Sequence, residues 1–187
     1  MKKYTAFINH DETTVNAFTR TQFNAFHARK RNILLVLAVL FIGVGGMELM
    51  GKTVSILCVL IGCLLLVNTG NIPRRTAKAI LSAGGQDRRV EYEFDDSGIH
   101  VTDGGRKADV KYSTIIRLIA DREFFYLFSA PNLVYMLEKN SLEPAEPDEF
   151  KAEIAAKCGL RWTAARSAMT ENVFSLWTIF VKPRKFL

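Results

Sequence analysis

Two long runs of apolar residues, Ile33 to Met47 and Val54 to Val67, follow each other closely in the first half of the chain. Between them only Glu48 and Lys52 are charged. Neither run carries the polar stripe with a 3.6-residue period that is typical of amphipathic helices in soluble proteins. A helix that spans a bilayer needs about 20 mostly apolar residues. The pattern therefore predicts a transmembrane helical hairpin over residues 32–72.

Lysine and arginine flank both ends of this hairpin and are nearly absent from its turn, where only Lys52 is basic. An excess of these residues marks the cytoplasmic flanks of membrane spans. We therefore expect a multi-pass membrane protein with both termini in the cytoplasm. The residues expected to contact the membrane surface beside the spans are Arg29, Lys30, Arg31, Arg74, Arg75 and Lys78.

Small residues are spaced along both predicted spans so that helix backbones could approach closely in lipid. The candidate packing residues are Gly43 and Gly46 on the first span and Ser55, Cys58 and Gly62 on the second. They predict packing within the hairpin, with homodimerisation as the alternative. Neither run has an ionisable residue at mid-depth, where proton relays and ion paths place them, so a two-helix transporter is not expected.

Helices are also predicted on both sides of the hairpin, and the one before it is amphipathic. Residues 1–31 form a charged N-terminal segment, in which residues 11–31 predict a helix with Asp11 at its N-cap. The aromatic face of this helix could lie on the bilayer or against the cytoplasmic domain. After the hairpin, residues 73–87 predict a basic juxtamembrane helix that ends at two glycines.

From residue 88 the hydrophobic period changes from helical to two, which indicates half-buried strands. Val90, Tyr92 and Phe94 alternate with acidic residues, and turn residues follow at 95–98 and 103–105. Further strands are predicted near 107–112, 114–120, 124–129 and 133–138, and a helix opens at 144–148 and closes at Gly159. Short strands at this spacing indicate an antiparallel meander. The predicted fold class is α+β: a two-helix transmembrane hairpin, then a small antiparallel PH-like sheet over residues 88–159 capped by a C-terminal helix.

This order of elements resembles the YcxB-like family of bacterial membrane proteins. The resemblance rests on Val90 to Val101, Tyr112 to Ile115, Phe125 to Phe128, Leu133 to Lys139 and the helix that follows, together with the preceding hairpin. It implies a protein of the bacterial inner membrane with a cytoplasmic PH-like domain, and it implies no catalytic residues.

Charge and cysteine content restrict the function further. The net charge is +6, but the basic residues lie beside the predicted membrane and in the tail, whereas residues 90–160 are acidic. This distribution fits attraction to anionic lipid and argues against nucleic acid. The three cysteines show no disulfide or metal spacing. No cofactor and no small-molecule substrate is indicated.

Candidate chemistry in the domain is sparse. Asp95 and Asp96 beside a glycine are typical turn formers rather than metal ligands, and Ser97 lacks the Gly-x-Ser-x-Gly setting of a hydrolase nucleophile. His100 has no adjacent nucleophile pattern. We therefore predict no enzyme activity and no metal site. Lipid headgroup recognition is disfavoured because the first turn is acidic and would repel phosphate.

The segment 160–187 is a basic, aromatic tail whose apolar stretch is too short to span a membrane. It suits an interfacial anchor or packing on the domain, and the sequence leaves both open. The candidate surface residues here are Trp177, Phe180, Lys182, Arg184 and Lys185.

These patterns predict a membrane-anchored, non-enzymatic protein-interaction or regulatory module. Its partners would be the bilayer and a protein of unknown identity, and a homodimer is the alternative. A second hypothesis is an accessory subunit of a transport or envelope assembly that docks through its transmembrane helices.

Overall fold

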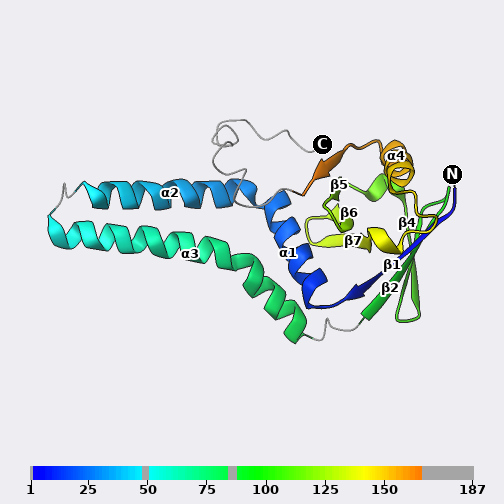
Figure 1. Ribbon diagram of the computed structural model, residues 1–187, viewed down its shortest axis with the longest axis horizontal. Helices are drawn as coiled ribbons and strands as arrows, with labels where there is room; N and C mark the ends of the chain where they lie inside the picture. The colour runs from blue at the N-terminus through cyan, green and yellow to red at the C-terminus, as the bar shows by residue number, and fades with distance from the viewer. Residues whose placement is uncertain (1, 48–50, 84–87, 166–187) are drawn as a thin grey trace. The chain divides into compact units, whose positions relative to one another are not determined.

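The computed structural model describes residues 2–47, 51–83 and 88–165, and its fold is α+β with largely antiparallel sheets. The chain divides into two compact units. Within the described residues, the first unit contains residues 2–22, 77–83 and 88–165, and the second contains residues 23–47 and 51–76. The first unit holds the strands, and the second holds two long helices (Figure 1).

The first sheet has the strand order β1-β2-β3-β4, and every neighbouring pair is antiparallel. Its strands are β1 (Tyr4–His10), β2 (Arg88–Phe94), β3 (Ile99–Asp103) and β4 (Arg106–Val110). The predicted alternation holds in β2 and β3. Strand β1 was not predicted, and it pairs with β2 along its whole length, from Tyr4 opposite Phe94 to His10 opposite Arg88. One sheet therefore combines residues from both sides of the predicted hairpin.

The second sheet has the strand order β7-β6-β5-β8. It consists of β5 (Arg117–Ala120), β6 (Phe124–Ala130), β7 (Leu133–Glu138) and β8 (Trp162–Ala164), and β8 runs parallel to β5. The strand predicted over 114–120 begins later, because the 3₁₀ turn η1 (Tyr112–Thr114) redirects the chain. A second such turn, η2 (Lys139–Ser141), follows β7.

Helix α4 (Pro147–Cys158) supplies the centre of the core between the sheets. The Phe150 ring is fully buried, and its centroid lies 5.3 Å from Tyr4, 5.0 Å from Phe94 and 5.4 Å from Phe125. These three rings come from both sheets, so α4 joins the sheets through one aromatic cluster. The helix ends at Gly159 in the left-handed conformation, with φ of 64°. The predicted helix and its glycine cap are confirmed.

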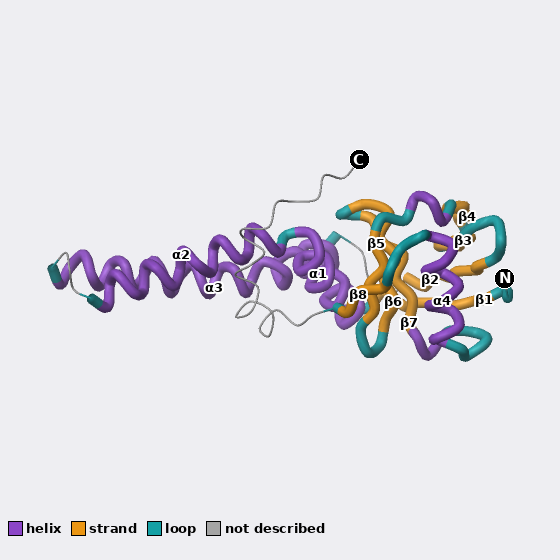
Figure 2. The backbone as a smooth tube through the Cα atoms, turned by 90° about the horizontal axis from the view of Figure 1, so that it is seen from above, coloured by secondary structure: helices purple, strands orange, loops and turns teal. Residues whose placement is uncertain are grey.

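The second unit is a helical hairpin. Helix α2 (Ala28–Gly46) and helix α3 (Lys52–Ser82), most of which belongs to this unit, run side by side in both views (Figures 1 and 2). Before them, α1 covers Glu12–Phe26, so the single helix predicted over 11–31 is interrupted at His27. The predicted cap is confirmed, since an Asp11 carboxylate oxygen accepts the Thr14 N–H at 2.7 Å.

One helix among the described residues is long and apolar enough to cross a membrane. Its candidate span is Lys52–Thr69 in α3, with a mean hydropathy of 2.0 and 17% of the segment buried. Helix α2 does not meet the same criterion, because its 19 residues include Arg29, Lys30 and Arg31 at the start. The structure therefore contains the predicted helical pair, but one candidate span where the sequence predicted two.

Candidate functional site: a polar trough on the first sheet

The two faces of the first sheet have opposite character. Tyr4, Ala6 and Ile8 of β1 are buried, as are Val90, Tyr92 and Phe94 of β2. Residues between them face outward, and strand register arranges them in two rows across the sheet. One row is Thr5, Glu93, His100 and Asp109, and the other is Phe7, Glu91, Thr102 and Lys107.

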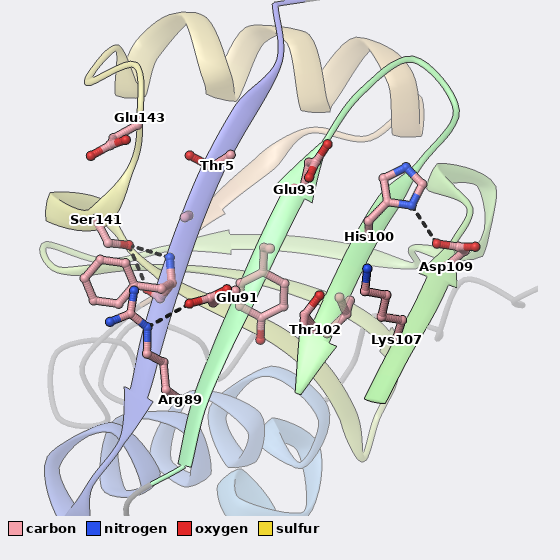
Figure 3. A pocket seen from close by; sticks show the side chains of 14 residues that line it. Thr5, Arg89, Glu91, Glu93, His100, Thr102, Lys107, Asp109, Ser141 and Glu143 are labelled. Atoms are coloured by element: carbon pink, nitrogen blue, oxygen red, sulfur yellow. Dashed lines mark hydrogen bonds and ion pairs between the residues drawn. The ribbon is translucent and has the colours of Figure 1, made fainter. Parts of the chain in front are cut away.

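These rows line an open, largely polar trough of about 530 Å³ (Figure 3). Ser141 and Glu143, which follow β7, form its border beside β1. The Ser141 hydroxyl accepts the Phe7 N–H at 3.0 Å and donates to a carbonyl oxygen. Thr5 and Glu143 exchange two backbone hydrogen bonds, at 2.7 and 2.8 Å. This border is therefore held by the Ser141 hydroxyl and by backbone pairing of Thr5 with Glu143.

Within the trough, the side chain of Arg89 lies against the aromatic ring of Phe7. The Arg89 guanidinium lies 4.3 Å from the centroid of the Phe7 ring, and its Nε lies 3.0 Å from the Glu91 carboxylate. Both charged side chains are more than half exposed, so the ion pair stabilises the fold weakly. The guanidinium covers the Phe7 ring with a polar group.

His100 lies between two carboxylates near the other border. Its Nδ1 is 2.6 Å from Asp109 Oδ1, and its Nε2 is 3.1 Å from Asp95 Oδ2. Each ring nitrogen must carry a proton for both contacts to be hydrogen bonds. The hydrogen bond to Asp109, and then the one to Asp95, raises the pKa of His100 above its usual value. His100 is thus clamped between two carboxylates that favour its protonated form.

Asp95 is itself fixed by the turn that follows β2. Its Oδ1 accepts hydrogen bonds from the Ser97 hydroxyl at 2.6 Å, the Ser97 N–H at 2.7 Å and the Gly98 N–H at 3.1 Å. These bonds, led by the Ser97 hydroxyl, lower the pKa of Asp95 well below its usual value. The predicted turn-forming role of Asp95 is confirmed by this bonding.

Ser97, His100 and Asp109 resemble a hydrolytic triad in composition but differ from one in the hydrogen bond that the serine makes. Ser97 Oγ lies 3.2 Å from His100 Nε2, yet Ser97 donates its proton to Asp95. A general base needs an Nε2 that can accept the serine proton, whereas here the Ser97 hydroxyl and His100 Nε2 both face the Asp95 carboxylate. The four side chains form one hydrogen-bonded cluster. Within the described ranges, no three metal-ligating side chains are grouped to hold a metal ion.

In the helical hairpin, the close contacts involve Gly45 and Gly62. A Cβ added at Gly45 would lie 2.7 Å from the Ser55 carbonyl oxygen, and one at Gly62 would lie 2.8 Å from the Ala38 carbonyl oxygen. Ser55 is buried in this contact and Cys58 is partly buried. Gly62 and Ser55, two of the expected packing residues, are therefore brought together with α2.

Gly43 and Gly46 do not take part in that contact. Both are exposed, and no heavy atom outside their own helix backbone lies within 4 Å of an added Cβ. Successive helical residues are 100° apart, so Gly45 occupies the face toward α3 while its neighbours point elsewhere. The spacing of the glycines in the sequence predicts that small residues recur along α2. It does not predict how α2 is rotated about its axis, and therefore which glycine faces α3.

The expected membrane-surface cations differ in exposure. Arg29 and Lys30 in the first turn of α2 are exposed, as are Arg74, Arg75 and Lys78 of α3. Arg31 is not: it is 5% exposed and donates a hydrogen bond to the Asn24 side chain. The prediction that Arg31 contacts the membrane surface is therefore wrong, because its side chain is buried. The tail residues Trp177, Phe180, Lys182, Arg184 and Lys185 lie outside the described residues.

The carboxylate clamp on His100 was missed, although the sequence contains its signal. The pair Gly104-Gly105, with φ of 54° and 83°, forms a two-residue hairpin turn. Counting outward from this turn places His100 opposite Asp109 and Thr102 opposite Lys107. Strand β1 also lines the trough, but it lies far from the other strands in the sequence. No local signal of this kind places it there.

Residues 94–154 match the family model of the YcxB-like protein. The matched segment runs from the last residue of β2 into α4 and includes the His100 cluster and β4. Strand β1 and the helical hairpin lie outside it. No curated protein and no solved structure matches the chain.

Proposed function

We propose that this protein is a membrane-anchored, non-enzymatic interaction module of the bacterial inner membrane. The observation that carries the proposal is the exposed apolar surface of α2 and α3. Of the exposed large apolar side chains, all but Ile116 and Leu133 belong to these helices or directly follow α2. The most exposed are Val39, Met47, Ile56, Leu60, Leu64 and Val67. A patch this extensive in water would favour aggregation, whereas lipid solvates it.

The dimensions of α3 support the same proposal. The uncharged stretch from Thr53 to Pro73 corresponds to about 30 Å of helix, the thickness of a bilayer core. In the antiparallel packing, Gly62 faces Ala38 and Gly45 faces Ser55. The same register brings the first turn of α2 level with residues 69–72, about one turn before Arg74 and Arg75. Long cationic side chains at that level can extend to the headgroups.

The pairing of β1 with β2 supports a two-span topology. These strands lie before and after the hairpin and form one sheet, so both flanks must be on the same side of the membrane. An even number of crossings follows if the hairpin is inserted. The basic flanks favour the cytoplasmic side for the domain, and the turn beside Lys52 would face outward.

The domain would then act by binding rather than by catalysis. Its strands followed by the helix α4 support a PH-like architecture. The groups in the trough are mutually paired, as in the His100 clamp and the Arg89–Glu91 pair, which suits a preformed recognition surface for a protein partner. Anchoring would raise the local concentration of the domain for a partner at the membrane.

Cysteine labelling in intact cells tests the anchoring. The background would replace Cys58 and Cys63 by Ser and Cys158 by Ala, and single cysteines would replace Lys52 or Ser113. We expect a membrane-impermeant maleimide to label only the Lys52→Cys variant in spheroplasts and both variants after lysis. Equal labelling of both before lysis, or recovery of the chain in the soluble fraction, would refute the topology.

In-cell crosslinking of the full chain tests the interaction. Glu91→Lys breaks the ion pair in the trough, and Glu123→Lys is the matched control, because it makes the same charge change at an exposed position outside the trough. Loss of crosslinked partners only in the first variant would support the proposal. Equal recovery from both variants would contradict a role for the trough.

One observation favours the accessory-subunit alternative. The exposed Gly43 and Gly46 leave a smooth strip of α2 with open space above it, on which another membrane helix could pack closely. Replacing both by Ile would abolish partner recovery under this alternative. The same replacement would leave it intact if the domain carries the interaction.

A further inference from the structure

Strand β4 ends the first sheet with an open edge. It is the outermost strand in the sheet order and in the close view (Figure 3). Arg106, Lys107, Ala108 and Asp109 are all exposed, so neither face of the strand is covered. No described residue pairs with its outer edge. An uncovered edge presents unpaired N–H and C=O groups.

The hairpin turn determines which backbone groups are unpaired. In a two-residue hairpin the residues that flank the turn, here Asp103 and Arg106, form a hydrogen-bonded pair. Alternation then gives Ala108 and Val110 bonds to β3. The N–H and C=O groups of Lys107 and Asp109 therefore point outward, away from the sheet.

The charges on this edge are complementary to themselves. In an antiparallel pair of two β4 strands centred on Ala108, Lys107 of each copy lies opposite Asp109 of the other. Their outward backbone groups would form hydrogen-bonded pairs in the same register. A shift of two residues in one direction places Lys107 opposite Lys107, and a shift in the other places Asp109 opposite Asp109. The charges thus select one register and oppose its neighbours.

We infer that β4 pairs with β4 of a second copy of this chain, which makes one continuous eight-stranded sheet. This inference deepens the proposed function, because it identifies one protein partner of the domain as the chain itself. A polar row would then cross both copies. It would run through Thr5, Glu93, His100 and Asp109 of one copy and Lys107, Thr102, Glu91 and Phe7 of the other.

Charge on an edge strand can also serve to prevent pairing. Protection is best achieved by a single sign of charge, since like charges repel in every symmetric register. Here a cation and an anion stand on either side of the centre, and His100 holds the Asp109 carboxylate in place at 2.6 Å. The arrangement therefore favours a second copy over an uncharged or singly charged peptide.

Disulfide crosslinking of the full chain in membranes tests the pairing. In the cysteine-free background, Ala108→Cys would place the two sulfur-bearing residues opposite each other, with Cα atoms about 4.5 Å apart, which suits a disulfide. Arg106→Cys is the matched control. It is also exposed on the same strand, but its two copies would be offset by four residues on neighbouring strands and so about 14 Å apart. We expect a covalent dimer from the first variant under mild oxidation and little from the second.

Charge exchange tests the register. Lys107→Asp or Asp109→Lys, each added to Ala108→Cys, creates two like-charged pairs and should lower the dimer yield about tenfold. The double exchange, and a mixture of the two single exchanges, restores opposite pairs and should restore the yield. Yields that do not respond to charge, or crosslinks from Ala108→Cys only to a different protein, would overturn the inference.

Membrane fractionation of the same samples separates this inference from the proposed function. A chain that sediments with membranes but gives equal yields from Ala108→Cys and Arg106→Cys overturns only the pairing. A chain that does not sediment with membranes overturns the anchoring, whatever its crosslinking pattern.

Discussion

Adding one methyl group at Gly45 or at Gly43 should change the stability of the helical hairpin in opposite directions. Both glycines lie inside α2, two positions apart, so Gly→Ala gives each a similar gain in helix propensity of about 0.5–1 kcal/mol. At Gly43 the new Cβ meets nothing within 4 Å. We therefore expect Gly43→Ala to stabilise the helix by that amount.

At Gly45 the new Cβ would lie 2.7 Å from the Ser55 carbonyl oxygen and 3.0 Å from the Val59 nitrogen. Ordinary contact begins at 3.4 Å, and backbone atoms cannot rotate away as a side chain can. Helix α3 must therefore move or the helices must separate. Overpacking of this kind costs about 1–3 kcal/mol. Because the propensity gain cancels between the variants, Gly45→Ala should be about 1–3 kcal/mol less stable than Gly43→Ala.

The assay is SDS-induced unfolding of the full chain in mild detergent micelles, followed by far-UV circular dichroism. Helix content dominates this signal, and α2 and α3 contribute most of the helix. Gly62→Ala serves as a second test from the opposite helix, since its Cβ would lie 2.8 Å from the Ala38 carbonyl oxygen. Free energies for Gly43→Ala and Gly45→Ala that agree within about 0.5 kcal/mol would refute the close approach at Gly45.

Three further predictions concern the domain. Phe150→Ala should lower its free energy of unfolding by about 3–5 kcal/mol in guanidinium titrations, because it removes the ring shared by both sheets; a loss below about 1 kcal/mol would contradict the cluster. Ile8→Asp should prevent the domain from folding, seen as rapid proteolysis, since β1 buries this side chain completely, whereas Asn9→Asp on the exposed face should resist proteolysis like the natural chain. The raised pKa of His100 stabilises the fold fully below its ordinary value of 6.5, and this contribution is lost as the pH rises through the higher folded-state value. His100→Gln should therefore flatten the fall in Tm above pH 6.5, and an unchanged slope would show that the clamp does not form.

The elements that could be predicted from sequence are those whose signal is local. The strand alternation of Val90, Tyr92 and Phe94 and the glycine that ends α4 depend only on neighbouring residues, and both are confirmed. Strand β1 also alternates, with Tyr4, Ala6 and Ile8 buried. Its pattern is short, and its partner strand follows about 80 residues later, a loop closure that no local pattern encodes.

The candidate site was less predictable, because it depends on how elements face each other. Which glycine of α2 packs on α3 is determined by the rotation of the helix about its axis, and this depends on the whole interface. The His100 clamp depends on cross-strand register, which the turn at Gly104 and Gly105 encodes. Ser141 reaches β1 from the end of β7, an arrangement that tertiary packing alone determines.

The pairing of β1 with β2 also determines the order in which this protein can be made. During synthesis β1 leaves the ribosome first, but its neighbour in the sheet emerges only after both long helices. The first strand must therefore remain without its β2 partner while both helices are synthesised. The domain can fold only after that step, so a folded domain reports a chain that has been synthesised beyond both helices. A protease site placed within β1 would be cut while β1 is unpaired and protected once β2 has paired with it. Cleavage at this site would therefore measure how long the domain takes to assemble.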